Sequence, residues 1–105
     1  MADGPRLSHT SAMILQAVRA GHIYGYMVME TTGLASGTVY PALRRLEQEE
    51  LIGSQWEHQS IADAALRPAR KYYRLTRSGE ALLEASRKRY PLLARLAPAE
   101  EVPEI

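Results

Sequence analysis

The densest group of chemically useful side chains is a run of cations between residues 67 and 77. The run reads RPARKYYRLTR, contains no acidic residue, and takes its charge from Arg67, Arg70, Lys71, Arg74 and Arg77. Residues 59–95 carry nine basic side chains against three acidic ones, although the net charge of the whole chain is only +1. A local positive field of this kind suits a polyanion. A solvated charged surface would explain the same run, so charge alone leaves both interpretations open.

A second group of candidate binding residues lies between a predicted tight turn and Arg44. The turn, Gly33-Leu34-Ala35, separates a short helix expected over 24–31 from an amphipathic helix expected over 36–50, which is the pattern of a helix-turn-helix. In that motif the second helix enters the DNA major groove by its N-terminal end, where hydroxyls contact phosphate or bases and arginine can bind guanine. A plain helical hairpin with a hydroxyl cap is the alternative. The exposed positions expected there are Ser36, Gly37, Thr38, Tyr40 and Arg44.

Other chemistries find no support in the residues. The chain has no cysteine, which excludes disulfides and thiolate metal sites and fits a reducing cytoplasm. His9, His22 and His58 are scattered without ligand spacing, and there is no nucleophile–base pair or glycine-rich phosphate loop. We therefore expect no metal, no cofactor and no enzymatic activity. The first ten residues lack the apolar stretch of a signal peptide, and no run reaches the roughly 18 apolar residues that span a membrane, so a cytoplasmic protein is expected.

Two of the expected helices have recognisable starts. The first helix spans Ser8 to Ala20 and has Ser8 as its N-cap. The third helix begins with either Ser36 or Thr38 as its cap. Pro41 costs no hydrogen bond if Thr38 is the cap, because the first amides of a helix have no partner, and costs one bond if Ser36 is the cap.

Two strand-like runs follow, over 51–58 and 70–76, and a polar, alanine-rich loop over 59–69 joins them. A long hairpin of this type is called a wing. Tyr73 is expected in the core. Trp56 is also favoured as a core residue, since tryptophan is highly buried on average, and the alternative is an aromatic surface for a planar ligand.

A last helix begins after Thr76, another credible N-cap, and Pro91 predicts a kink or break near Tyr90. Pairing with the same helix of a second copy would bury its apolar stripe. Packing against the first helix of the same chain is the alternative. The residues assigned to dimerisation are Leu82, Leu83, Tyr90, Leu93 and Leu96.

The order and spacing of these features resemble the PadR family of bacterial transcription factors. The resemblance covers roughly residues 8–83, through YGYMVMETTGLASGTVYPALRRLEQEELIGSQWE followed by RPARKYYRLTRSGEALL. The matching marks are Gly25-Tyr26, Gly37-Thr38-Val39-Tyr40-Pro41 with Leu43 and Leu46, Leu51-Ile52, Trp56-Glu57, and Arg70-Lys71-Tyr72-Tyr73-Arg74-Leu75-Thr76 with Gly79.

This resemblance implies a dimeric repressor whose third helix reads the major groove, whose wing contacts the DNA backbone and whose C-terminal helix mediates dimerisation. Many members of the family are released from DNA by a small molecule, often phenolic or an aromatic drug, which would make Trp56 part of an effector pocket. The chain departs from the family at Ser36, where proline is frequent. It also departs in the wing, where Ala65-Leu66-Arg67-Pro68 replaces a glycine-containing segment.

The sequence as a whole predicts a mainly α fold with a small β-hairpin. It comprises a winged helix-turn-helix domain over 1–76, a C-terminal dimerisation helix over 77–96 and a disordered tail over 97–105. The expected function is sequence-specific binding of a palindromic operator by a homodimeric repressor. The rival is a winged-helix interaction module for an acidic partner protein, which the acidic patch of Glu47, Glu49 and Glu50 supports slightly. The candidate DNA contacts are Tyr24, Ser36, Gly37, Thr38, Tyr40, Arg44, Arg67, Arg70 and Lys71.

Overall fold

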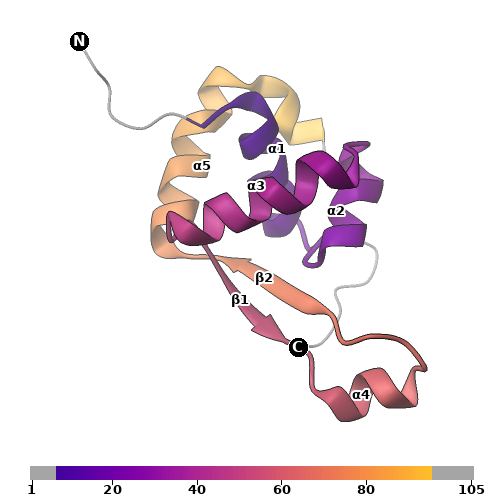
Figure 1. Ribbon diagram of the computed structural model, residues 1–105. Coiled ribbons are helices and arrows are strands. Elements are labelled where there is room, and N and C mark those ends of the chain that lie inside the picture. The colour runs from indigo at the N-terminus through magenta and orange to yellow at the C-terminus, as the bar shows by residue number, and fades with distance from the viewer. Residues whose placement is uncertain (1–6, 96–105) are drawn as a thin grey trace.

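The chain begins with three helices. A capping residue marks the start of the first helix, and a glycine marks the end of the second. The computed structural model describes residues 7–95 (Figure 1). In α1 (His9–Arg19), Ser8 is the N-cap, and its hydroxyl accepts a hydrogen bond from the Ser11 amide at 3.0 Å, which confirms the predicted cap. α2 (Gly25–Thr32) ends at Gly33, whose φ of 75° lies in the left-handed region that favours glycine.

α3 (Ser36–Gln48) begins without a hydroxyl cap. Ala35 is the N-cap residue and no side chain bonds the first amides, so the predicted cap at Ser36 or Thr38 is wrong. Pro41 consequently lies inside the helix, where its ring nitrogen cannot donate to the carbonyl one turn earlier. Ser36 and Thr38 are exposed to solvent and are not used in capping.

The wing is a two-stranded antiparallel hairpin of β1 (Ile52–Trp56) and β2 (Lys71–Leu75), each shorter than the sequence predicted. The register places Ile52 opposite Leu75 and Trp56 opposite Lys71. Ile52 at the base is buried, while the strands run outward from the helical body (Figure 1).

A short helix, α4 (Gln59–Ala64), lies at the far end of the wing where a loop was predicted over 59–69 (Figure 1). Alanine is the best helix former, and the segment QSIADA has two of them. The Gln59 side-chain amide also donates to the Asp63 carboxylate at 2.8 Å, an i,i+4 pair of the kind that stabilises helices. The composition of the segment therefore carried a helix signal that its polar residues concealed.

α5 (Arg77–Arg89) returns to the body and closes the core. The Thr76 hydroxyl accepts a hydrogen bond from the Gly79 amide at 3.1 Å, which confirms the second predicted cap. The helix ends at Tyr90, and a 3₁₀ turn, η1 (Pro91–Arg95), follows, so the predicted break at Pro91 is confirmed. Between residues 7 and 95, no helix is long and apolar enough to cross a membrane.

The apolar stripe of α5 is used mainly inside the chain. Leu83 and Leu93 are both 1% exposed and belong to the same core cluster as the buried residues of α1 and α3, so they are corrected from dimer contacts to core residues. Leu82 and Tyr90 are partly buried against this core. Packing against α1, the alternative that the sequence left open, therefore takes most of the stripe. Leu96 and the tail over 97–105 lie outside the described residues.

Candidate nucleic-acid interface

The exposed face of α3 carries the residues that the sequence singled out for base and phosphate contact. Val39, Leu43 and Leu46 point into the core and are fully buried. Because a helix has 3.6 residues per turn, burying this stripe turns the opposite face outward. The residues on that exposed face are Ser36, Gly37, Thr38, Tyr40 and Arg44.

Tyr40 connects this face to the start of α2. Its ring lies so close to Gly25 that a Cβ on residue 25 would stand 2.4 Å from a ring carbon. Glycine at position 25 thus allows the tyrosine to lie flat against the backbone of α2. Tyr40 remains 44% exposed, and its ring and hydroxyl can meet a ligand on this side of the molecule.

The wing meets α2 through Tyr24. Tyr24 forms an isolated β-bridge with Tyr72, and their rings pack edge to face at a centroid distance of 5.7 Å. The guanidinium of Arg70 lies over the Tyr24 ring, 4.2 Å from its centroid, a cation–π contact. No carboxylate among residues 7–95 forms a salt bridge with Arg70.

A concave pocket of about 400 Å³ joins α2, α3 and the wing. Of the residues that the structure describes, no acidic one lines this pocket, and the charged residues that do are all basic. Trp56 is one of its walls and is 63% exposed, which shows that the favoured core position for this residue is wrong. The aromatic and basic residues that line the pocket are Tyr24, Tyr26, Tyr40, Trp56, Tyr73, Arg67, Arg70 and Lys71.

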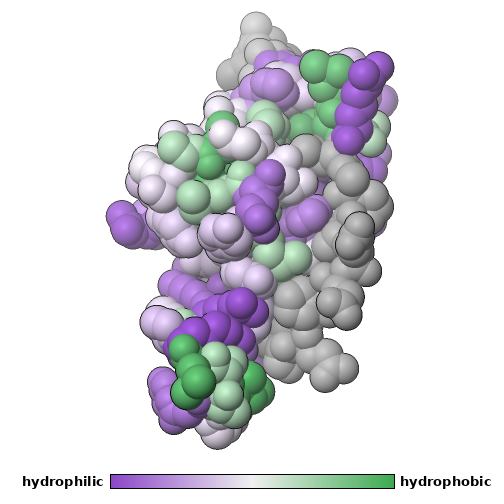
Figure 2. Space-filling view, turned by 90° about the vertical axis from the view of Figure 1, so that its right-hand side faces the viewer, coloured by the Kyte–Doolittle hydropathy of each residue, from purple (hydrophilic) through white to green (hydrophobic). Residues whose placement is uncertain are grey.

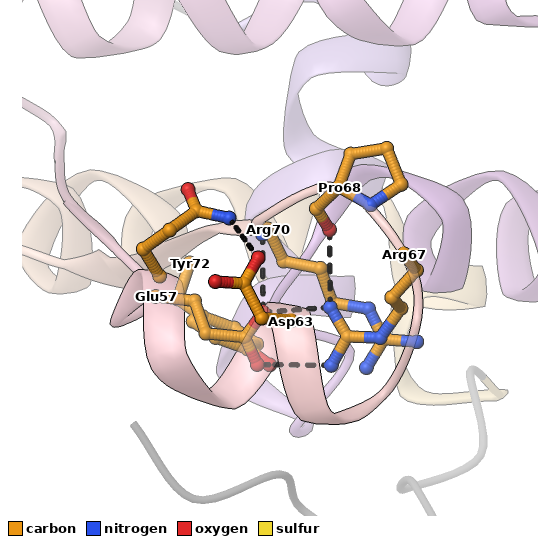
Figure 3. Close-up of polar contacts among 7 residues, drawn as sticks. Glu57, Asp63, Arg67, Pro68, Arg70 and Tyr72 are labelled. Atoms are coloured by element: carbon orange, nitrogen blue, oxygen red, sulfur yellow. Dashed lines mark hydrogen bonds and ion pairs between the residues drawn. The ribbon is translucent and has the colours of Figure 1, made fainter.

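A buried carboxylate next to this pocket joins the end of β1 to the chain that returns into β2 (Figure 3). The Glu57 side chain is 4% exposed and accepts two hydrogen bonds from the Arg67 guanidinium, at 2.6 and 2.9 Å. It also accepts from the Arg70 amide at 3.2 Å and from the Tyr72 hydroxyl at 3.1 Å. The two-pronged Arg67 bond, together with the other two donors, lowers the pKa of Glu57 from 4.5 to about 2.

We call the hydrogen bonds that Glu57 accepts from Arg67, Arg70 and Tyr72 the Glu57 clamp. This clamp changes the interpretation of Arg67. The sequence placed Arg67 among the phosphate contacts, but its guanidinium is bound by Glu57 and by its own neighbour, the Pro68 carbonyl, at 3.2 Å. Arg67 therefore serves as a structural residue of the wing, because its charge is already paired.

Lys71 is engaged as well. Its ammonium lies 3.2 Å from a carboxylate oxygen of Glu47 at the end of α3. The Ser54 hydroxyl donates to the same carboxylate, and this bond, with the nearby Lys71 charge, lowers the pKa of Glu47. Glu47, which the sequence assigned to an acidic patch, thus ties α3 to both strands of the wing. Arg44, Arg70 and Arg74 are among the cations of this region that no described carboxylate pairs with.

Sequence reasoning missed the role of Glu57. The residue was visible as an acid at the end of the first strand-like run, directly before a stretch with an excess of cations. Its partner could not be named, because the pairing depends on α4 folding the chain back between positions 57 and 67.

We expect the clamp to make stability depend on pH in one window. A lowered pKa in the folded state means that the stabilising contribution is present above about pH 4.5 and is lost as the pH falls toward 2. Glu57→Gln should lower the thermal midpoint of unfolding at neutral pH, and the gap to the wild type should narrow through this window. Unfolding followed by circular dichroism across the pH range measures this gap.

Glu84→Gln is the matched control. The Glu84 side chain is 74% exposed, and its ion pair within the described chain is with Arg87 on the surface of α5, at 3.2 Å, so its removal should have little effect on stability at any pH. A gap for Glu57→Gln that stays constant from neutral pH to pH 2 would show that the clamp does not titrate as described.

The order helix, helix-turn-helix, hairpin and closing helix defines a winged helix-turn-helix protein, with its second motif helix exposed and its wing beside it. The chain belongs to the transcriptional regulator PadR-like family, whose model matches residues 14–85. It is a DNA-binding transcriptional regulator and not an enzyme.

Solved structures agree with this assignment. A PadR family transcription regulator from Clostridium difficile R20291 is 26% identical, with a TM-score of 0.69 over 84% of this chain and 93% of that one. A PadR family transcriptional regulator from Eggerthella lenta is 25% identical, with a TM-score of 0.58 over 81% and 76% of the two chains. Bordetella bronchiseptica BpsR shares the fold at 19% identity, with a TM-score of 0.68 over 90% and 67%. None of the curated proteins compared with the chain matches it.

Proposed function

We propose that the protein is a sequence-specific repressor that places α3 in the DNA major groove. The observation that carries this proposal is the exposed face of α3 from Ser36 to Arg44, which borders a pocket lined by Arg70 and by no acidic residue between positions 7 and 95. A polyanion that lies along this surface meets small residues at the start of α3, where phosphate and the major groove can approach closely. Tyr24 and Tyr40 line the pocket beside this path, and in the proposed complex they contact the DNA backbone.

We propose further that the protein acts as a homodimer on a palindromic operator. Two copies of α3 about 34 Å apart would meet half-sites one helical turn apart. The dimer surface we favour is formed by α5 and η1, where Leu92 is 62% exposed and Leu82 and Tyr90 are partly exposed. Leu83 and Leu93 support this surface from beneath, because they are buried in the core of one chain.

A gel-shift titration with the DNA just upstream of the protein's own gene tests the proposal. Retention of this DNA in the presence of random competitor DNA is expected. Arg70→Ala should weaken binding to all sequences alike and lower the slope of log affinity against log salt concentration by about one unit, because one phosphate contact is lost.

The control is Arg87→Ala, which removes one cation from α5, where the side chain pairs with Glu84. It should leave the salt slope unchanged. Binding that random DNA abolishes completely would contradict sequence-specific recognition, and the rival role as an interaction module for an acidic protein would then take its place.

We also propose that a planar aromatic acid regulates DNA binding through the pocket between α3 and the wing. Such a ligand could stack on Trp56 and set its carboxylate against Arg70, and it would occupy the groups that DNA needs. The DNA binding of BpsR, which shares the fold, is regulated by 6-hydroxynicotinic acid, a molecule of this class.

Trp56 provides the readout for this part of the proposal, because it is the only tryptophan of the chain. Titration with a series of hydroxylated aromatic acids, 6-hydroxynicotinic acid included, should quench its fluorescence and release bound DNA over the same concentration range. Release without quenching would place the regulatory site elsewhere.

A further inference from the structure

The end of the wing combines an exposed apolar surface with a backbone that its sequence does not favour. Leu66 follows α4, is 93% exposed and has φ 58°, in the left-handed region. Ile61 on α4 is 51% exposed. In Figure 2 the lower end of the molecule, which Figure 1 identifies as α4 and the turn after it, shows hydrophobic atoms at the surface.

α4 ends in a type of turn that usually has glycine at its left-handed position, but here leucine occupies that position. The Leu66 amide donates to the Asp63 carbonyl at 3.0 Å and the Arg67 amide donates to the Ala62 carbonyl at 3.2 Å, the pattern in which the left-handed residue is usually glycine. A leucine here strains the backbone and exposes an apolar side chain to water, and a glycine would avoid both costs. Glu50 has the same backbone conformation, but of the two only Leu66 combines it with a large apolar side chain that is almost fully exposed, and this combination points to a function other than folding.

The charges around the tip indicate what it meets. Between residues 58 and 69 the only arginine or lysine is Arg67, and Glu57 binds its guanidinium. The unpaired cations lie nearer the body, at Arg70 and Arg74. The tip therefore offers apolar side chains and no free cation to a polyanion that reaches it from α3 and Arg70.

We propose that Leu66, assisted by Ile61, is a wedge that enters the minor groove beside the half-site that α3 contacts and partly unstacks one base step. Leucine and isoleucine are among the side chains that DNA-bending proteins insert in this way. The Glu57 clamp supports the wedge, because it fixes the return of the chain directly after Leu66. This inference rests on the proposed DNA-binding function.

The test uses the duplex that the full-length protein retains against competitor, with 2-aminopurine placed at successive positions that flank the α3 half-site. Unstacking raises the fluorescence of this base, so the wild type should produce a rise at one step in each half-site. Leu66→Gly should abolish the rise and weaken binding by roughly tenfold. The loss is modest because the free energy gained from an inserted side chain is only slightly larger than the cost of unstacking the bases. The same variant should have a higher thermal midpoint of unfolding, since glycine relieves the strained turn.

Two further variants distinguish insertion of the Leu66 side chain from the effects of backbone strain and of side-chain size. Glu50→Gly relieves the same left-handed turn at the end of α3, where φ is 60°, and should also raise the thermal midpoint while the fluorescence rise remains. Leu66→Met keeps an apolar side chain that can wedge and should keep the rise.

Three results would overturn the inference. Leu66→Gly could bind with unchanged affinity and an unchanged rise, which would place the tip outside the groove. It could instead change the oligomeric state seen in sedimentation while DNA binding stays the same, which would assign the tip to a protein contact. Failure of the wild type to bind any sequence specifically would refute the proposed function itself. This outcome is distinguishable from the other two, because it is seen with the wild type before any variant is made.

Discussion

Replacing Gly79 with alanine should destabilise the fold by about 1–3 kcal/mol or more, the range seen when a methyl group is forced into a packed interior. The Cβ of an alanine at this position would stand 2.0 Å from the Leu51 carbonyl oxygen and 3.0 Å from its carbon. These are backbone atoms and cannot rotate away. The same carbonyl accepts the Thr76 amide at 3.0 Å, so moving it also strains the junction at which α5 begins.

Gly37→Ala provides the opposite result for comparison. Gly37 is also helical, and no atom lies within 4 Å of the position that its Cβ would take. Alanine there should stabilise the protein by about 0.5–1 kcal/mol, because glycine is a poor helix former. Urea unfolding of both variants measures the difference. Equal effects of the two substitutions would show that Gly79 does not approach the Leu51 carbonyl as closely as described.

Replacing Arg44 with alanine should weaken binding to the operator by about 1–3 kcal/mol and relax the preference at one base pair of each half-site. Arg44 lies on the exposed face of α3, and no carboxylate among residues 7–95 pairs with it. Its guanidinium is therefore available for two parallel hydrogen bonds to guanine, the commonest specific contact in the major groove. Competition binding with single-base variants of the operator measures the preference.

Arg45→Ala is the control on the same helix. Arg45 is also exposed, but it donates to the Ser11 hydroxyl at 3.2 Å and so leans toward α1. Its loss should reduce affinity for all sequences slightly and leave the base preference intact. If Arg44→Ala and Arg45→Ala reduce binding to every sequence alike, Arg44 contacts phosphate and another residue reads the base.

Much of the fold follows from local chemistry that any structure of this chain would have to respect. Ser8 and Thr76 can cap helices, Gly33 permits a left-handed ending, and Pro91 cannot continue a helix, so these boundaries were predictable. The exposed face of α3 was predictable for a similar reason. Once Val39, Leu43 and Leu46 share the buried side of a helix, positions such as Tyr40 and Arg44 must lie on the exposed side.

The positions that sequence reasoning placed wrongly depend on partners distant along the chain. Trp56 resembles a core residue by type, yet it faces outward because the hairpin leaves the body before reaching it. Leu83 and Leu93 resemble an uncovered stripe until α5 folds back against α1.

The amino-acid sequence by itself determined the helix-turn-helix pattern, the second helix of that motif and the exposed residues of this helix, because periodicity and helix breakers act within a few residues. Only the tertiary structure decided which cations remain free to meet DNA. Arg67 and Arg70 are the same residue type and lie three positions apart in one basic run, so the sequence alone does not distinguish them. The folded wing places the buried carboxylate of Glu57 against the guanidinium of Arg67, and it leaves the guanidinium of Arg70 on an aromatic ring at the mouth of the pocket. Ion pairing depends on distance in space, and that distance is set by the fold.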